Sequence, residues 1–270
     1  MYYNIIINKM LLFALVFIIV IILIYFFYFL LPYVNMKHKD LRIVVFDLDE
    51  TIGYFQQFAQ FCQGLEFLKK KKLIQNEVMF LLSLYPEYFR PNIFEIMHFL
   101  KQKKINKEVY KICIYTNNNG PKQWAKQIYK FIENKINYKL FDNHIGAYKI
   151  DGVQIEKTRT THNKTLSDFL ITTKIPHHAK ICFIDDLYHP HMTGSNVTYI
   201  KVQPYTIELP LNVITSRFCQ NTRCNIPHNE FNKVISRFLH SSVPHNITIN
   251  HTANGEKILK DLETFFINHY

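Results

Sequence analysis

Two aspartates separated by one residue follow a short apolar run, and they are the part of this sequence best suited to chemistry. Asp47 and Asp49 come directly after residues 43–46, whose residue types predict a buried strand. Side chains two residues apart point the same way from an extended backbone, so both carboxylates would face one space. One carboxylate can attack phosphorus while the other moves a proton. The pair indicates phosphoryl transfer, although acidic residues also end strands simply by turning the chain into solvent.

Two later segments repeat this layout of an apolar run followed by polar side chains. The apolar runs span 111–115 and 180–184, and the polar residues after them include Thr116, Asn117, Asp185 and Asp186. Short β-rich runs that alternate with helical stretches predict an α/β fold with a parallel sheet and flanking helices. Ligands of such sheets bind beyond the carboxyl ends of the strands. The polar clusters are therefore expected to converge on one crevice.

In this order along the chain, the motifs resemble those of the haloacid dehalogenase (HAD) superfamily of phosphohydrolases. Within it they resemble the NLI-interacting-factor-like branch, which includes phosphatases of the RNA polymerase II tail. The matching residues are Asp47-Leu48-Asp49-Glu50-Thr51, Thr116, the lysine of Lys164-Thr165-Leu166, the pair Asp185-Asp186, and Arg90-Pro91 ahead of an apolar helix. The resemblance covers about residues 41–205 and implies a HAD-like Rossmannoid sheet.

The resemblance also implies roles for the four aspartates. Asp47 would attack phosphorus to form an aspartyl-phosphate, and Asp49 would protonate the leaving group and then activate water. Mg²⁺ prefers a few hard oxygen ligands and keeps bound waters. Asp47, Asp185 and Asp186 would hold it, with Asp186 in direct contact, and the backbone carbonyl of Asp49 would also face the metal.

Phosphate binding is expected from the second motif and from a lysine. Thr116 and the backbone of the turn that begins at Asn117 would bind phosphate oxygens ahead of a helix. The resemblance implies that a lysine neutralises the charge gathered there. Lys164 is chosen because it precedes a helix whose apolar face would pack on the sheet. Lys157 lies nearby in the sequence and is the alternative.

The motifs also depart from the branch that they resemble. Polymerase-tail phosphatases usually continue the first motif with His-Ser and the second with Ala-Ser, whereas this chain has Ile52-Gly53 and Asn117-Asn118 at these places. The variant resembles relatives from large DNA viruses. Two functions are weighed: a phosphatase acting on a phosphoprotein or a small metabolite, and a non-catalytic HAD-like receptor or assembly factor on a membrane. The presence of both Asp47 and Asp49 favours the enzyme.

The N-terminus predicts a membrane anchor. Residues 10–31 contain no charged side chain, and a helix of this length spans a hydrocarbon core of about 30 Å. No small-residue cleavage site follows it, so we expect an uncleaved single-pass anchor over residues 1–35. Cations are more frequent after the span (Lys37, Lys39, Arg42) than before it (Lys9), and this bias places the following domain in the cytosol. The membrane would be a viral or a host-cell membrane.

The rest of the chain predicts one globular domain. We expect the HAD-like domain over 36–210, flanking helices rather than a full cap domain between 53 and 90, and a β-hairpin around Asp151-Gly152. Residues 211–270 are expected to form a helical extension, with helices in 231–239 and 256–267.

The amino-acid composition limits the kinds of ligand that this domain is expected to bind. The net charge of +11, concentrated in runs such as Lys69–Lys72, suits anionic lipid or phosphorylated substrates, or is simply a solvated face. No base-stacking motif indicates nucleic-acid binding. The five cysteines form no disulfide framework, and Cys219 with Cys224 is a weak zinc signal. His189 and His191 follow the acidic pair and could line the site, but in a proline-containing loop they are expected on the surface.

Overall fold

The computed structural model describes residues 15–26, 28, 41–118, 120, 123–222, 226–240 and 251–267. The chain divides into two compact units, residues 1–41 and residues 42–270. In the first unit, residues 15–25 form a helix whose side chains are exposed. None of the described helices is long and apolar enough to cross a membrane, and the predicted span of 10–31 extends beyond the described residues. Membrane insertion stays a prediction.

The second unit is built on a five-stranded sheet with the order β3-β2-β1-β6-β7, in which every pairing is parallel. Its strands are β1 (Arg42–Phe46), β2 (Lys111–Tyr115), β3 (Asn143–Ile145), β6 (Lys180–Asp185) and β7 (Val197–Lys201). In the central register, Phe46 of β1 pairs with Ile114 of β2 and with Ile184 of β6. The residues that follow these three positions therefore leave the sheet at the same edge, as the sequence predicts.

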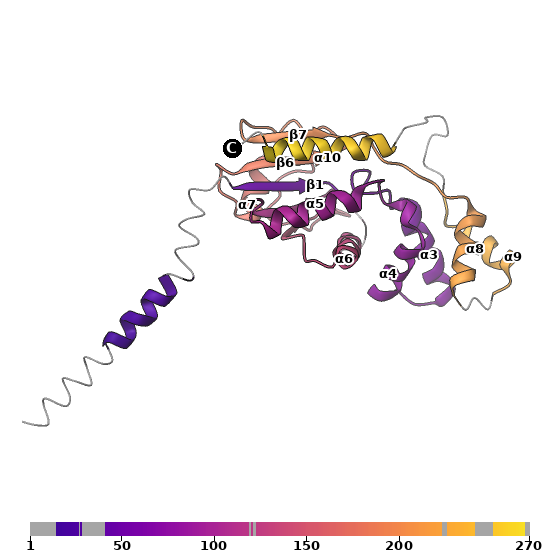
Figure 1. The fold of residues 1–270 in the computed structure, drawn as a ribbon. Coiled ribbons are helices and arrows are strands. Elements are labelled where there is room, and N and C mark those ends of the chain that lie inside the picture. The colour runs from indigo at the N-terminus through magenta and orange to yellow at the C-terminus, as the bar shows by residue number, and fades with distance from the viewer. Residues whose placement is uncertain are drawn as a thin grey trace, which may run out of the picture. The chain divides into compact units, whose positions relative to one another are not determined.

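Helices connect the strands and cover the sheet. The first connection contains α3 (Gln56–Lys69), α4 (Gln75–Leu84), a 3₁₀ turn (Pro86–Tyr88) and α5 (Ile93–Ile105). Later connections contain α6 (Trp124–Ile136) and α7 (Leu166–Thr173), and the C-terminal helices are α8 (Leu211–Asn221), α9 (His228–Ile235) and α10 (His251–Ile267). Figure 1 shows α10 beside β7 and α5, whereas α8 and α9 pack with α3 and α4 at the other end of this unit.

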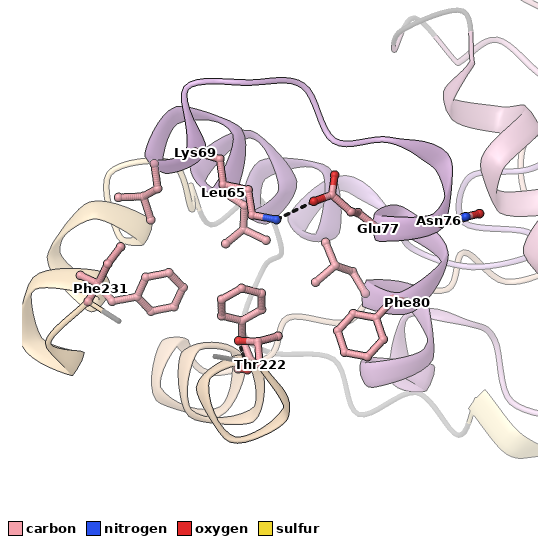
Figure 2. A pocket seen from close by; sticks show the side chains of 11 residues that line it. Leu65, Lys69, Asn76, Glu77, Phe80, Thr222 and Phe231 are labelled. Carbon is pink, nitrogen blue, oxygen red and sulfur yellow. Dashed lines mark hydrogen bonds and ion pairs between the residues drawn. The ribbon is translucent and has the colours of Figure 1, made fainter. Parts of the chain in front are cut away.

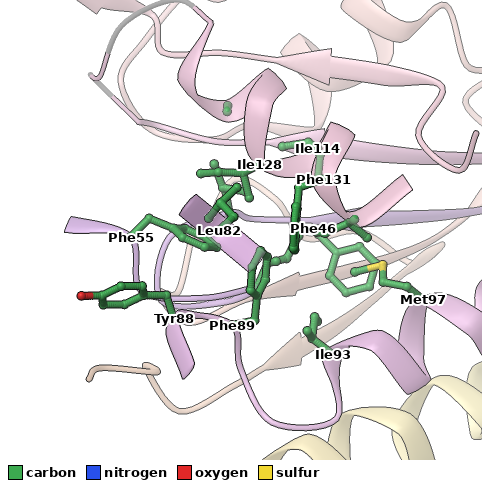
Figure 3. Packing of buried hydrophobic residues seen from close by; sticks show 14 of the residues in the cluster. Phe46, Phe55, Leu82, Tyr88, Phe89, Ile93, Met97, Ile114, Ile128 and Phe131 are labelled. Atoms are coloured by element: carbon green, nitrogen blue, oxygen red, sulfur yellow. The ribbon is translucent and has the colours of Figure 1, made fainter. Parts of the chain in front are cut away.

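Aromatic side chains dominate the core beneath the sheet. Phe46 of β1 lies among three side chains (Figure 3): Phe89, which precedes α5, Met97 of α5, and Phe131 of α6. The rings of Phe89 and Phe131 are stacked with centroids 5.3 Å apart. All four side chains are buried, and truncating a buried Phe to Ala typically costs about 3–5 kcal/mol. This packing fixes α5 and α6 against the strands from which the polar motifs emerge.

The predicted β-hairpin is confirmed. Strands β4 (Lys149–Ile150) and β5 (Val153–Gln154) pair antiparallel. The two residues between them, Asp151 and Gly152, both have positive φ, at 49° and 79°. Two consecutive positive φ angles are what the tight turn of a two-residue hairpin requires, and Asp-Gly is among its preferred sequences.

The helices α3, α4, α8 and α9 enclose an apolar cavity of about 480 Å³ (Figure 2). Leu65, Phe80 and Phe231 contribute to its lining, and an ion pair of 2.8 Å joins Lys69 of α3 to Glu77 of α4. None of the predicted site residues lines it. This apolar cavity is thus separate from the polar edge of the sheet, and it does not help to locate the chemistry.

Candidate active site

Three carboxylates meet where β1 and β6 end. Asp47 follows β1 directly, Asp185 is the last residue of β6, and Asp186 is the next residue. One ligand atom from each of these side chains lies within 4.8 Å of the others, and all three residues are buried. The backbone N–H of Asp47 donates to the carbonyl of Ile184 at 2.9 Å, which ties the two strand ends together. We call these three side chains the carboxylate cluster.

Lys164 reaches this cluster from the N-terminus of α7. Its ammonium donates to Oδ1 of Asp47 and, at 2.6 Å, to Oδ2 of Asp185, and its side chain is only 2% exposed. The next residue, Thr165, caps α7 by accepting the N–H of Asp168. Lys157, the alternative lysine, is exposed on the chain that follows the hairpin. The geometry therefore favours Lys164 as the lysine of the site.

The cluster holds more negative charge than one lysine balances. Burial, with repulsion from Asp185, raises the pKa of Asp47 to about 6 against the opposing effect of Lys164. Burial and the charge of Asp47 raise the pKa of Asp186 to about 7. For Lys164, burial acts to lower the pKa, but Asp47 and Asp185 outweigh it and the pKa is raised. The ammonium stays charged, and a further cation would relieve the remaining repulsion.

Asp49 lies beside the carboxylate cluster rather than within it. Its Oδ2 accepts a hydrogen bond of 2.7 Å from the side-chain amide of Asn118. Burial and the charge of Asp47 raise its pKa to about 6. A carboxyl group with that pKa can hold or release a proton near neutral pH, which is what a general acid and base needs. The predicted contact of its backbone carbonyl with a metal stays a prediction.

The turn after β2 places the side chain of Asn118, and not that of Asn117, beside Asp49; phosphate binding by the backbone of this turn stays a prediction. Thr116 is buried, and its Oγ1 accepts the N–H of Asn118 at 3.0 Å. The side chain of Asn118 accepts the N–H of Gly120 and donates to Asp49, whereas Asn117 is exposed. Period-two alternation from Thr116 was the available signal, because it places Asn118 on the same side as the threonine.

A family model of the NLI interacting factor-like phosphatases matches residues 42–212, well over half of the 270 residues. The chain belongs to this family. It is a HAD-type phosphatase that hydrolyses phosphate monoesters, as predicted. A comparison with curated proteins found no match.

The carboxylate cluster of this phosphatase fits a divalent metal, which HAD phosphatases generally use. All three donors are hard oxygens, as Mg²⁺ prefers. Asp186 is held in orientation by Thr51, whose Oγ1 donates to Oδ1 of Asp186 at 2.9 Å and accepts the N–H of the same residue. Lys164 occupies one oxygen each of Asp47 and Asp185. The metal would therefore use Asp186 and the other oxygen of Asp47.

Arg90 binds the backbone of the first phosphatase motif, residues 47–51. Its guanidinium donates to the carbonyls of Thr51, Glu50 and Gln203, each at 2.6 or 2.7 Å. At the same turn, a Cβ on Gly53 would lie 2.4 Å from the carbonyl of Tyr88, so only glycine fits there. In the sequence, Arg90 was noted as part of the Arg90-Pro91 pair ahead of an apolar helix. Its hydrogen bonds to the carbonyls of the first motif could not be predicted.

Arg159 links three loops that surround the phosphate side of this phosphatase. It is 1% exposed and donates to the carbonyls of Gly146 at 2.9 Å, His162 at 2.8 Å and Thr116 at 3.3 Å. Its guanidinium lies 4.9 Å from the ring centroid of Tyr115. Sequence reasoning missed it, because an arginine in a polar loop carries no pattern of its own.

One expectation about the histidines was wrong. His191 is exposed as expected, but His189 is buried, with its Nε2 3.5 Å from Oδ2 of Asp185. Burial and the charge of Lys164 lower the pKa of His189 to about 4. The imidazole is therefore neutral at physiological pH and adds no positive charge to the cluster. The connection between β6 and β7, residues 186–196, folds it inward, and the loop-like sequence does not reveal this course.

Proposed function

We propose that this phosphatase removes phosphate from a protein by way of a phosphorylated Asp47, with Mg²⁺ as its metal. The observation that supports the proposal most is the placement of Asp47: it is buried, it contacts Lys164, and Asp49 follows it at the mouth of the site. A nucleophile, a cation for the phosphate charge and a proton carrier thus lie together.

The residues suggest two chemical steps. In the first, a carboxylate oxygen of Asp47 attacks phosphorus, and the bond from phosphorus to the leaving oxygen breaks as Asp49 gives its proton to that oxygen. In the second, Asp49 takes a proton from water, whose oxygen attacks phosphorus and releases Asp47 and inorganic phosphate. Lys164 and the Thr116 turn neutralise and orient the phosphate oxygens in both steps. A bound divalent cation would supply further charge neutralisation.

The cavities on both sides of the site support a polypeptide as the substrate. One cavity, of about 570 Å³, is lined by Asp49, Asn118 and Gly120 and extends along α3. A second, of about 350 Å³, shares Asn118 and Gly120, begins at Thr116 and extends to the hairpin β4–β5. We call them the leaving-group cavity and the hairpin cavity. A chain that continues in both directions from its phosphorylated residue would use both.

The decisive test is to trap phosphate on Asp47. The full chain is incubated with Mg²⁺ and a phosphopeptide, quenched in acid, and mapped by mass spectrometry. We expect a phosphoryl group on the peptide that contains Asp47, and none in an Asp47→Asn variant. Hydrolysis at the same rate by that variant would contradict the proposed mechanism.

We also propose that residues 10–31 anchor the domain in a membrane with the catalytic part in the cytosol. The support is the uncharged sequence of this segment and the excess of cations after it. The chain should remain in the membrane fraction after alkaline extraction and lose its C-terminal part to protease added from the cytosolic side. Release by alkali, or protection from protease until the membrane is dissolved, would contradict the anchor or its orientation.

A further inference from the structure

The leaving-group cavity has a chemical character of its own. It begins at Asp49, which in the proposed function gives its proton to the leaving oxygen. A peptide bound there would therefore place one of the two residues next to its phosphorylated residue in this cavity. The remaining lining comes from α3 and the segment before it, which includes Glu50 and Tyr54, from the turn after β2, which includes Asn118, and from Trp124 at the start of α6.

Among the described residues that line this cavity there is no lysine or arginine. The ionisable side chains are those of Asp49, Glu50 and Tyr54, and the three glutamines of α3 contribute neutral amides. The hairpin cavity differs, because Lys126 and His144 line it together with Glu156. Although the chain has a net charge of +11, the charged side chains of the described residues that line this cavity are thus acidic.

Glu50 is the source of this negative charge when Asp49 carries the proton. The backbone of Glu50 is fully used: its N–H donates to Gly53, and its carbonyl accepts from Arg90 and from the N–H of Tyr205. No hydrogen bond or ion pair within the described residues involves its carboxylate. The group is half-buried and lines the cavity. A half-buried carboxylate without a partner has most to gain from a cation brought by a ligand.

We propose, on the basis of the proposed function, that Glu50 selects phosphopeptides with a lysine or arginine next to the phosphorylated residue. The basic side chain lies in the leaving-group cavity with its cation beside Glu50, while the glutamine amides of α3 contact the neighbouring peptide groups. An acidic neighbour is disfavoured because Glu50 and Asp47 repel it. The same charge disfavours leaving groups that carry further phosphates, such as nucleotides.

The test uses phosphoserine decapeptides that differ at one position. Lys, Gln or Glu is placed directly before the phosphoserine in one set and directly after it in another. The specificity constant kcat/KM is measured for the full chain with Mg²⁺ at pH 7.5. In one of the two sets we expect Lys to exceed Glu by about tenfold, the size expected for a charge pair at a partly exposed site, with Gln between them.

Variants of Glu50 assign the preference to its carboxylate. Glu50→Gln keeps the shape of the side chain and should reduce the ratio of Lys to Glu substrates to about twofold or less, while Glu50→Lys should invert it. Glu263→Lys makes the same charge change on an exposed position of α10 and should keep the wild-type ratio. Each ratio is taken within one variant, so partial loss of activity or of folded protein does not affect it.

The outcomes separate this inference from the function on which it rests. If the wild-type chain hydrolyses p-nitrophenyl phosphate and phosphopeptides but both sets give a ratio near one, the inference is wrong and the proposed function stands. A ratio that survives Glu50→Gln would also overturn it. Hydrolysis of p-nitrophenyl phosphate without hydrolysis of any phosphopeptide would overturn the choice of a peptide substrate. No hydrolysis of any monoester would instead contradict the proposed function.

Discussion

The phosphate side and the leaving-group side of this active site differ in how many hydrogen-bond partners their carboxylates have within the protein. On the phosphate side, Lys164 already binds Asp47 and Asp185, and Thr51 already binds Asp186. On the leaving-group side, Asp49 has one amide partner and is half-buried. The comparison suggests that the phosphate side is organised before substrate binds, whereas the leaving-group side responds to what binds there. Four changes test this difference.

Removing the nucleophile should have the largest effect. Asp47→Asn keeps the size of the side chain but cannot form an aspartyl-phosphate, so kcat for p-nitrophenyl phosphate should fall by about a thousandfold or more. Asp151→Asn, in the hairpin turn where φ is 49°, is a matched control because asparagine tolerates this backbone conformation. It should keep wild-type activity. Full activity of the Asp47 variant would place the nucleophile elsewhere.

Removing the lysine should have the next largest effect. Lys164→Met leaves the carboxylates without their internal cation, and capture of beryllofluoride, which mimics the phosphoryl group on Asp47, should weaken by about a hundredfold. Lys157→Met, on an exposed side chain, should bind beryllofluoride as the wild type does. Calorimetric titration measures both. If the two effects were reversed, Lys157 would be the lysine of the site.

Removing the proton carrier should have an effect that depends on the leaving group. Asp49→Asn should slow hydrolysis of phosphoserine peptides by about a hundredfold, because a serine alkoxide needs a proton to leave. The loss for p-nitrophenyl phosphate should be smaller, since nitrophenolate leaves without one. Steady-state kinetics with both substrates gives the comparison. An equal loss for both would mean that Asp49 acts on the phosphate side.

The smallest expected effect is the way in which pH and bound metal change the stability of the folded state. The pKa of Asp186 is raised from 3.8 to about 7 and that of Asp47 to about 6, so the folded state binds more protons than the unfolded state between about pH 4 and 7. Without metal, these groups make stability fall as pH rises through that window. Bound Mg²⁺ reverses this, because it competes with the same protons.

Thermal unfolding between pH 5 and pH 8 measures this linkage. The increase in Tm caused by Mg²⁺ should be larger at pH 8 than at pH 5, and the Asp186→Asn variant should show a weaker dependence on pH. A gain in Tm from Mg²⁺ that is largest at pH 5 would show that the cluster does not hold the metal.

The sequence was sufficient for the parts of the site that depend on regular structure. Asp47, Thr116 and the acidic pair follow apolar runs, and the common edge of a parallel sheet brings them together whatever the loops do. Asn118, Arg159 and His189 were missed because their roles depend on the course of loops and on side chains distant in sequence. Helix α8 was missed as well: its apolar face is buried only because α4 and α9 lie against it.

The close approach of α10 to the first turn of α5 bears on where the catalytic unit ends. A Cβ on Gly255 would lie 2.3 Å from the carbonyl of Pro91, the residue after Arg90, which holds the first motif. Phe265 and Phe266 of the same helix are buried, yet α10 lies beyond residue 212, where the family match ends. The part of the chain that folds as one unit, residues 42–270, thus extends beyond the residues that the family model matches, and its last helix contacts the segment that leads from Arg90 into α5.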